Sequence, residues 1–280
     1  MIKETKISSI SDYLEWVRNS HLVEYTEHEF VCYQGHVYYR GHASTSWELT
    51  PSLFRESDII HDENKMLQQA NNLLWSELYD CKTELEKMIR LQHYGLHTRL
   101  LDVTFNPLVA LFFACQPVTN PSDDKDGVIY CGHQVESEKR SSQAIAEYVF
   151  HYDTYNINER GLNEICKQYK VHKNLLEEAH FLNPPFNNLR IAAQNGAFIM
   201  APLIKKDAIP PFLHANQQHI KKSLEESFTY KANIPAGIKD EILTELDYLG
   251  FNQATIFIDI TNKLQYINMK EAKDWPILDL

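Results

Sequence analysis

Apolar residues spaced three and four positions apart predict several helices along the chain. The longest stripe runs through residues 62–92 and contains Leu67, Ala70, Leu74, Leu78, Cys81, Leu85 and Met88. Residues 8–18 predict a first helix with Ser11 as its N-terminal cap. An apolar helix is expected to begin at Pro107, because a proline at the first helical position removes no helical hydrogen bond. Further helices are expected at residues 217–228 and 236–250, and in part of residues 141–180.

Runs of β-branched and aromatic residues predict strands between these helices. Extended structure is expected at residues 37–40, 96–104, 127–131, 189–201 and 255–260. Strands and helices are interspersed without a regular strand–helix–strand repeat, which favours an α+β fold over a doubly wound sheet. We expect a single α+β domain over residues 30–280, with a mixed, mostly antiparallel sheet flanked by helices. Residues 1–29 are expected to form a helical extension before it.

The charge of the chain limits the partners it can have. Its 280 residues carry 27 Lys and Arg against 38 Asp and Glu, which gives a net charge of −11. A chain this acidic repels phosphate backbones at long range, so broad nucleic-acid binding is disfavoured. A local basic site that recognises one nucleotide remains compatible with this charge.

Cysteine and hydrophobic patterns favour a reduced, cytoplasmic protein with no membrane partner. The five cysteines are scattered and form no Cys-x-x-Cys pair, so zinc-ribbon and thioredoxin-like sites are not expected. The longest apolar run, residues 107–115, is about half as long as a membrane span requires. His93 and His97 have the spacing of helical metal ligands, but Gly95 lies between them and is expected to break the helix. No metal is therefore predicted.

Three blocks of sequence stand out from this background. The first, residues 39–55, begins Tyr-Arg-Gly-His and continues through Trp-Glu-Leu to an arginine. The second, residues 91–107, contains Leu-Gln-His-Tyr-Gly and Thr-Arg-Leu-Leu-Asp. The third, residues 190–198, is Arg-Ile-Ala-Ala-Gln-Asn-Gly-Ala-Phe. Together they resemble the FRG domain, named for an aromatic-Arg-Gly motif, over roughly residues 30–265.

Arginines within these blocks are candidates for binding an anion. Arg40 is followed directly by Gly41, which places a fork of donors beside backbone that a ligand can approach closely. This suits a phosphate or pyrophosphate. The alternative is that Arg40 pairs with Asp102 or Glu48 inside the fold. The ligand-binding candidates are Gly41, His42, Arg55, His93, Thr98, Arg99, Thr104 and Arg190.

Asp102 is the candidate for acid–base or orienting chemistry. On an extended segment, Asp102 and Thr104 share one face and project together. A carboxylate among apolar neighbours needs a partner or a shifted pKa, and it can orient a hydroxyl or take up a proton. The alternative for Thr104 and Asn106 is that they cap the helix that follows.

The order of the blocks is similar to that of the ADP-ribosyltransferase superfamily. That superfamily has an Arg or His on a first core strand, a Ser, Thr or Tyr on a second strand followed by a helix, and a Glu on a later strand. The resemblance implies a transferase that uses NAD as substrate, with Arg40, Asp102 and Gln194 as catalytic residues. Gln194 stands where the superfamily has its glutamate, so Asp102 is expected to supply the carboxylate.

Two alternatives from other classes stay open. One is a non-catalytic module that recognises a nucleotide or a protein, and the other is a hydrolase or nuclease that uses Asp102 with His93 or His42. Family resemblance also implies a toxin or antiviral defence effector, with an antitoxin or defence-system partner. The acceptor would be a nucleic acid or a protein.

Overall fold

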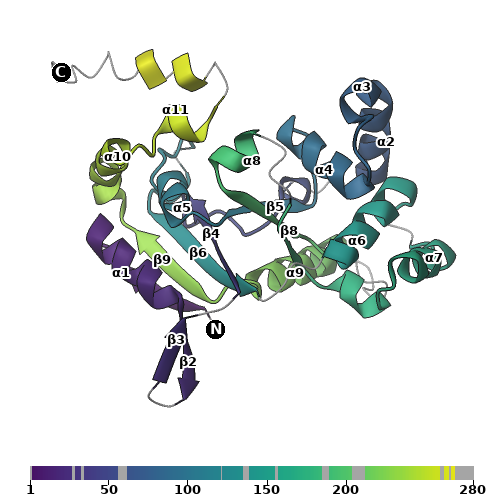
Figure 1. Cartoon of the computed structure of the whole chain (residues 1–280), viewed down its shortest axis with the longest axis horizontal. Helices are drawn as coiled ribbons and strands as arrows, with labels where there is room; N and C mark the ends of the chain where they lie inside the picture. Colours follow the sequence, from purple (N-terminus) through teal and green to yellow (C-terminus); the bar gives the residue numbers. More distant parts are fainter. Residues whose placement is uncertain are drawn as a thin grey trace.

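The computed structural model describes most of the chain. The described residues are 2–26, 29–32, 35–55, 62–120, 122–134, 139–154, 157–184, 189–203, 212–258, 262–264 and 266–268. Strands and helices alternate irregularly along the chain. Most of the strands form one mixed sheet, and the helices lie around it (Figure 1). The α+β class predicted from the sequence is confirmed.

Seven strands form the main sheet, in the order β1-β9-β6-β4-β5-β8-β7. Among the strands of the described residues, only the β1–β9 pair is parallel, so the sheet is mixed and mostly antiparallel, as expected. The strands, in sheet order, are Lys3–Lys6, Tyr230–Ile234, Gly127–Gln134, His36–His42, Leu100–Thr104, Gly196–Met200 and His180–Leu182. A separate hairpin contains β2 (Leu22–Thr26) and β3 (Glu29–Cys32). Strand β1 belongs to the expected N-terminal extension, residues 1–29, but lies in the main sheet. The domain boundary at residue 30 stays a prediction.

Helices cover the sheet and carry the connections between its strands. The longer ones are α1 (Ile10–Ser20), α2 (Glu63–Leu73), α4 (Glu84–His93), α5 (Pro107–Ala114), α6 (Lys139–His151), α7 (Glu159–Tyr169), α9 (Phe212–Glu225) and α10 (Lys239–Tyr248). The short ones are α3 (Trp75–Leu78), α8 (Leu189–Ala193) and α11 (Gln253–Ile256), with single turns at Ser52–Phe54, Lys173–Glu177 and Ala236–Ile238.

The sheet is nearly divided between β4 and β5. These two strands are joined at a single residue pair, Tyr39 with Thr104. By contrast, β4 pairs with β6 along its whole length, from His36 to His42. Beyond Tyr39 the two central strands separate, and the main-chain groups on their facing edges become accessible to side chains. The candidate site lies at this opening.

Helix α5 packs against the sheet beside this opening, because two glycines allow it to approach. A Cβ atom on Gly41 would lie 1.9 Å from the carbonyl oxygen of Ala110, and one on Gly127 would lie 2.2 Å from that of Ala114. The helix is apolar on every side and mostly buried, as expected for a helix at the centre of a fold. The Tyr13 hydroxyl of α1 donates to the Pro107 carbonyl at 2.7 Å, which attaches the first turn of α5 to α1.

Several predicted elements differ from the structure. The first helix begins at Ile10 and is capped by Ser9, whose hydroxyl accepts from Asp12 N at 3.1 Å, so Ser11 is not the cap. The predicted helix over residues 62–92 is divided into α2, α3 and α4 because Leu74 leaves the helical conformation and Thr83 starts a new cap. Its apolar stripe nevertheless packs into one cluster.

Two predicted strands also contain helices. Residues 189–201 form α8 and then β8, separated at Asn195, whose φ of 46° breaks the helix. The strand expected at 255–260 is wrong over its first residues, because Asn252 and Thr255 form a reciprocal capping box that starts α11. Residues 259 and 260 lie outside the described residues.

Candidate functional site

A cavity of about 360 Å³, called here the central pocket, lies where β4 and β5 separate. Arg40 from β4, Asp102 from β5 and Gln194 from the turn before β8 all line it. These residues come from the three separate sequence blocks. Of the predicted binding residues, the lining also includes Gly41, His42, Arg55, Thr104 and Arg190. The structure therefore brings most of the predicted site together.

Arg40 spans the opening in the sheet. Its Nε donates to His42 Nε2 at 2.8 Å, and its Nη1 donates to the main-chain carbonyl of Asp102. Burial lowers the pKa of Arg40 to about 10, and the Asp102 carboxylate opposes this effect. The guanidinium therefore stays charged at neutral pH. Two of its five N–H groups are used in these bonds, which leaves donors for a ligand.

His42 is held neutral beside Arg40. Its side chain is buried, and burial, followed by the charges of Arg40 and Arg55, holds its pKa well below the usual value. Because Nε2 accepts from Arg40, the proton of the neutral ring is on Nδ1. A neutral His42 orients the guanidinium without adding a competing positive charge.

Asp102 presents a carboxylate at the edge of the pocket. It is the exposed residue of an otherwise buried strand. Its Oδ1 accepts from Gln92 Nε2 at 2.8 Å, which fixes the orientation of the carboxylate. Thr98 in turn donates to Gln92 Oε1, so Thr98 supports Gln92 and does not itself line the central pocket.

Thr104 ties the second block to the third. Its hydroxyl donates to the Gln194 carbonyl at 2.6 Å and accepts from Asn106 N at 3.0 Å. The capping atom of α5 is Asn106 Oδ1, which accepts from Leu108 N at 2.9 Å. Thr104 therefore fixes the main chain of Gln194, while the Gln194 amide donates to the Ile256 carbonyl at 3.4 Å.

Gly41 has a packing role besides the predicted one, and Arg99 lies away from the central pocket. The backbone that approaches Gly41 closely is that of α5, so this glycine serves packing, although it also lines the pocket. Arg99 is fully buried away from the central pocket. It pairs with Glu63, donating from Nε to Oε1 at 2.7 Å, and its Nη1 donates to the Pro202 carbonyl at 2.7 Å.

The central pocket has an excess of positive charge in an acidic protein. Its charged lining residues are Arg40, Arg55 and Arg190 against the single carboxylate of Asp102. Arg55 and Arg190 are both exposed. With a net charge of −11 over the whole chain, this concentration of guanidinium groups favours an anionic ligand.

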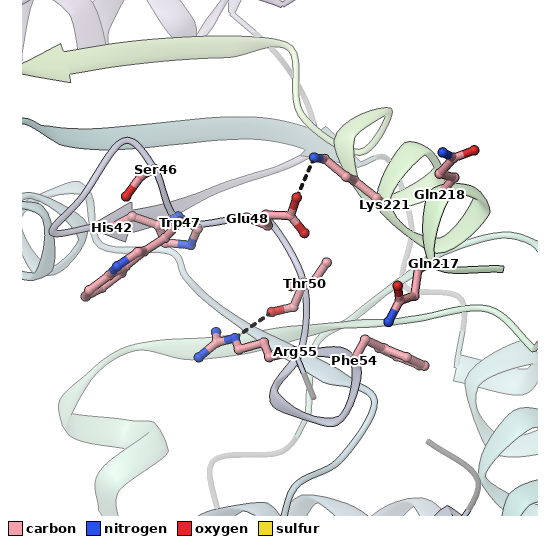
Figure 2. A pocket seen from close by; sticks show the side chains of 10 residues that line it. All are labelled: His42, Ser46, Trp47, Glu48, Thr50, Phe54, Arg55, Gln217, Gln218 and Lys221. Atoms are coloured by element: carbon pink, nitrogen blue, oxygen red, sulfur yellow. Dashed lines mark hydrogen bonds and ion pairs between the residues drawn. The ribbon is translucent and has the colours of Figure 1, made fainter. Parts of the chain in front are cut away.

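Two further cavities adjoin the central pocket. A side pocket of about 90 Å³ shares Asp102, Arg190 and Gln194 with it and includes His93, whose pKa is lowered by burial and by Arg190. The outer pocket, of about 680 Å³, shares His42, Trp47 and Arg55 with it and is shown in Figure 2. Sequence reasoning missed the outer wall of that pocket, because it is the polar face of α9 and carries no motif.

Neither a metal centre nor a membrane span is found in the described part of the chain. No group of three or more His, Cys, Asp or Glu side chains there could hold a metal ion. Within the same residues, no helix is long and apolar enough to cross a bilayer.

Comparison with known families supports the resemblance read from the motifs. The family model of the FRG domain matches residues 35–124, which hold the first two sequence blocks and the strands β4 and β5. The FRG resemblance is confirmed over these residues. No curated protein and no solved structure matches the chain.

Proposed function

We propose that the protein is an ADP-ribosyltransferase-like enzyme with NAD as its substrate. One observation carries this proposal: Arg40, Asp102 and Gln194, which are far apart in sequence, line one cavity at the opening between two central strands. The strands of the first and second blocks are neighbours in the sheet, and β8 of the third block pairs with β5. The superfamily resemblance concerned only the order of the three blocks along the chain. The neighbouring positions of their strands in the sheet add support to the proposal.

The arginines are suited to hold the pyrophosphate of NAD. A pyrophosphate presents several oxygens, and guanidinium forks bind such groups through paired hydrogen bonds. Arg40 is fixed by His42 and by the Asp102 carbonyl, so little of its side-chain entropy remains to be lost on binding. Both the central and the outer pocket have volumes in the range of small-molecule sites.

Asp102 is suited to act at the reacting carbon. In the transfer reaction the bond between ribose C1′ and nicotinamide breaks, nicotinamide leaves with the bonding electrons, and the acceptor atom bonds to C1′. The proton of the acceptor must go to a base, and Asp102 is the carboxylate that lines the central pocket. Its negative charge also stabilises positive charge that develops on the ribose.

Gln194 is assigned a positioning role. An amide cannot take up a proton, but it can donate to and accept from a ribose hydroxyl. The bond from Thr104 to the Gln194 carbonyl fixes its main chain at the pocket. This replacement of a glutamate by a glutamine also favours a second candidate function, a module that binds a nucleotide without turnover.

Mass spectrometry of purified protein with NAD tests the proposal. The wild type is expected to release nicotinamide or to label an acceptor, and Arg40→Ala is expected to abolish this. Arg160→Ala is the matched control, because the Arg160 side chain is 91% exposed and pairs only with the exposed Glu164 among described residues. Unchanged turnover in Arg40→Ala would overturn the proposal.

A second variant separates catalysis from recognition. Asp102→Asn keeps an oxygen that accepts from Gln92 but removes the charge. An enzyme is expected to lose turnover by about 10²-fold or more while its NAD affinity changes little. NAD binding without nicotinamide release in the wild type would instead identify the recognition module.

The proposed role as a toxin or antiviral defence effector is tested in cells. Expression of the wild type is expected to stop growth, whereas expression of Arg40→Ala is not. Equal growth of the two strains, at equal protein levels, would contradict it.

A further inference from the structure

The outer pocket is the larger of the two cavities that adjoin the central pocket, and it holds none of the three proposed catalytic residues. Figure 2 shows its two walls: Trp47 and His42 lie on one side, and α9 carries Gln217, Gln218 and Lys221 on the other. Phe54 and Arg55 lie below them in this view. The Trp47 indole and the polar side chains of α9 therefore line the same cavity of about 680 Å³.

Trp47 is a fixed and accessible aromatic surface. This residue is 43% exposed, although tryptophan is usually well buried. The indole is held in place because Nε1 donates to Asp123 Oδ2 at 2.7 Å. An indole held at its polar edge and exposed to this extent is suited to stacking against a flat aromatic ligand.

Arg55 supplies the positive charge for an anionic group on that ligand. It lines both the outer and the central pocket, so it stands at their junction. Its Nε donates to the Thr50 carbonyl at 3.3 Å, which leaves its terminal nitrogens for other bonds. The other cation of the outer pocket, Lys221, is paired with Glu48 at 2.8 Å. The pocket thus has one guanidinium whose charge no described carboxylate pairs with.

The wall formed by α9 supplies hydrogen-bonding groups. Gln217 and Gln218 are neighbours on this helix, the first half-buried and the second exposed. Each amide offers both donors and an acceptor, which is what the polar edge of a nucleobase requires. A stacking face, a polar edge and a phosphate-binding cation are therefore grouped around one cavity.

We propose that the outer pocket binds a single nucleotide unit, with its base against Trp47 and its phosphate at Arg55. This inference deepens the proposed function, and only the source of the nucleotide rests on that function. The unit is either the adenosine monophosphate half of NAD or one nucleotide of an acceptor strand. Binding of one unit agrees with the acidic charge of the chain, which disfavours extended contact with a nucleic-acid backbone.

Calorimetry of the full chain with AMP and with a short single-stranded oligonucleotide tests the site. Trp47→Ala is expected to weaken binding by about 5- to 150-fold, the usual loss for one stacked base. Trp47→Phe is expected to retain most of the affinity, because it keeps an aromatic face. Trp75→Ala is the matched control, since Trp75 is 70% exposed on α3 and lines none of these pockets. Absence of nucleotide binding, or equal affinity in Trp47→Ala, would overturn the proposal.

Competition with NAD identifies the source. Displacement of AMP by NAD identifies the pocket as the adenosine site of NAD, and AMP binding to NAD-saturated protein identifies it as an acceptor site. Both results support a nucleotide site at Trp47. If AMP binds through Trp47 but the chain neither binds nor cleaves NAD, the enzymatic proposal fails while this one stands.

Discussion

Arg40 donates a hydrogen bond through Nη1 to the main-chain carbonyl of Asp102, across the gap where β4 and β5 separate. This carbonyl lies on a strand edge that would otherwise pair with a neighbouring strand. The guanidinium thus replaces a missing sheet contact and at the same time presents its other donors to the central pocket. Structure and ligand binding are therefore combined in one side chain.

Gly41→Ala is expected to destabilise the fold by about 1–3 kcal/mol, because its Cβ would overlap the Ala110 carbonyl of α5. Urea unfolding measures the effect. The control is Gly237→Ala, whose Cβ would meet nothing within 4 Å and which is expected to change stability by about 0.5 kcal/mol or less. Equal stability of the two variants would contradict the packing role of Gly41.

Glu63→Gln is expected to lower the free energy of unfolding by about 3–5 kcal/mol, because it leaves the charge of Arg99 buried without a carboxylate. Lys65→Gln on the same helix serves as the control. Lys65 is 74% exposed in its pair with Asp62, so its loss is expected to cost about 0–1 kcal/mol. Denaturation midpoints that coincide for the two variants would show that Arg99 is not a structural residue.

Thr104→Val is expected to lower stability by about 1–3 kcal/mol and to weaken NAD binding. The valine leaves Asn106 N and the Gln194 carbonyl without their partner, and Gln194 loses its attachment to β5. Thr104→Ser keeps the hydroxyl and is expected to restore NAD affinity. A serine variant that binds NAD as poorly as the valine variant would refute a positioning role for this hydroxyl.

His42 is expected to make the fold less stable as the pH falls. Its pKa in the folded chain is depressed, whereas an unfolded histidine titrates near about 6.5. Below that pH His42 takes up a proton in the unfolded chain but not in the folded one. The contribution of the neutral His42 to the stability of the fold is therefore complete only above about pH 7. The stability advantage of wild type over His42→Gln should fall by about 1 kcal/mol between pH 6.5 and 5.5. An advantage independent of pH in this window would contradict a buried neutral His42.

Local patterns predicted much of the sheet but not the helix breaks. The aromatic and β-branched runs gave the positions of β4, β5 and β6, because these strands are buried and their composition reflects it. The stripe over residues 62–92 correctly predicted residues that pack into one hydrophobic cluster, four of them buried and three partly buried. Its division into three helices depends on turns at Leu74 and before Thr83, which leave the spacing of the apolar residues unchanged.

The sequence predicted which residues belong to the candidate site better than it predicted the role of each residue. The motifs contain Arg40, Asp102 and Gln194, and these residues do converge. Arg40 and Arg99 could not be distinguished by sequence, since both lie in motifs beside apolar residues. The distinction comes from Glu63, which is distant in sequence and reaches Arg99 only through the tertiary fold. The wall of the outer pocket was missed for a similar reason, because Gln217 and Gln218 belong to an ordinary polar helix face.

A crystal structure of the chain with NAD tests the central claim most directly. We expect pyrophosphate density at the Arg40 guanidinium and the nicotinamide ribose between Asp102 and Gln194. Density at another surface, or none in the central pocket at saturating NAD, would contradict it.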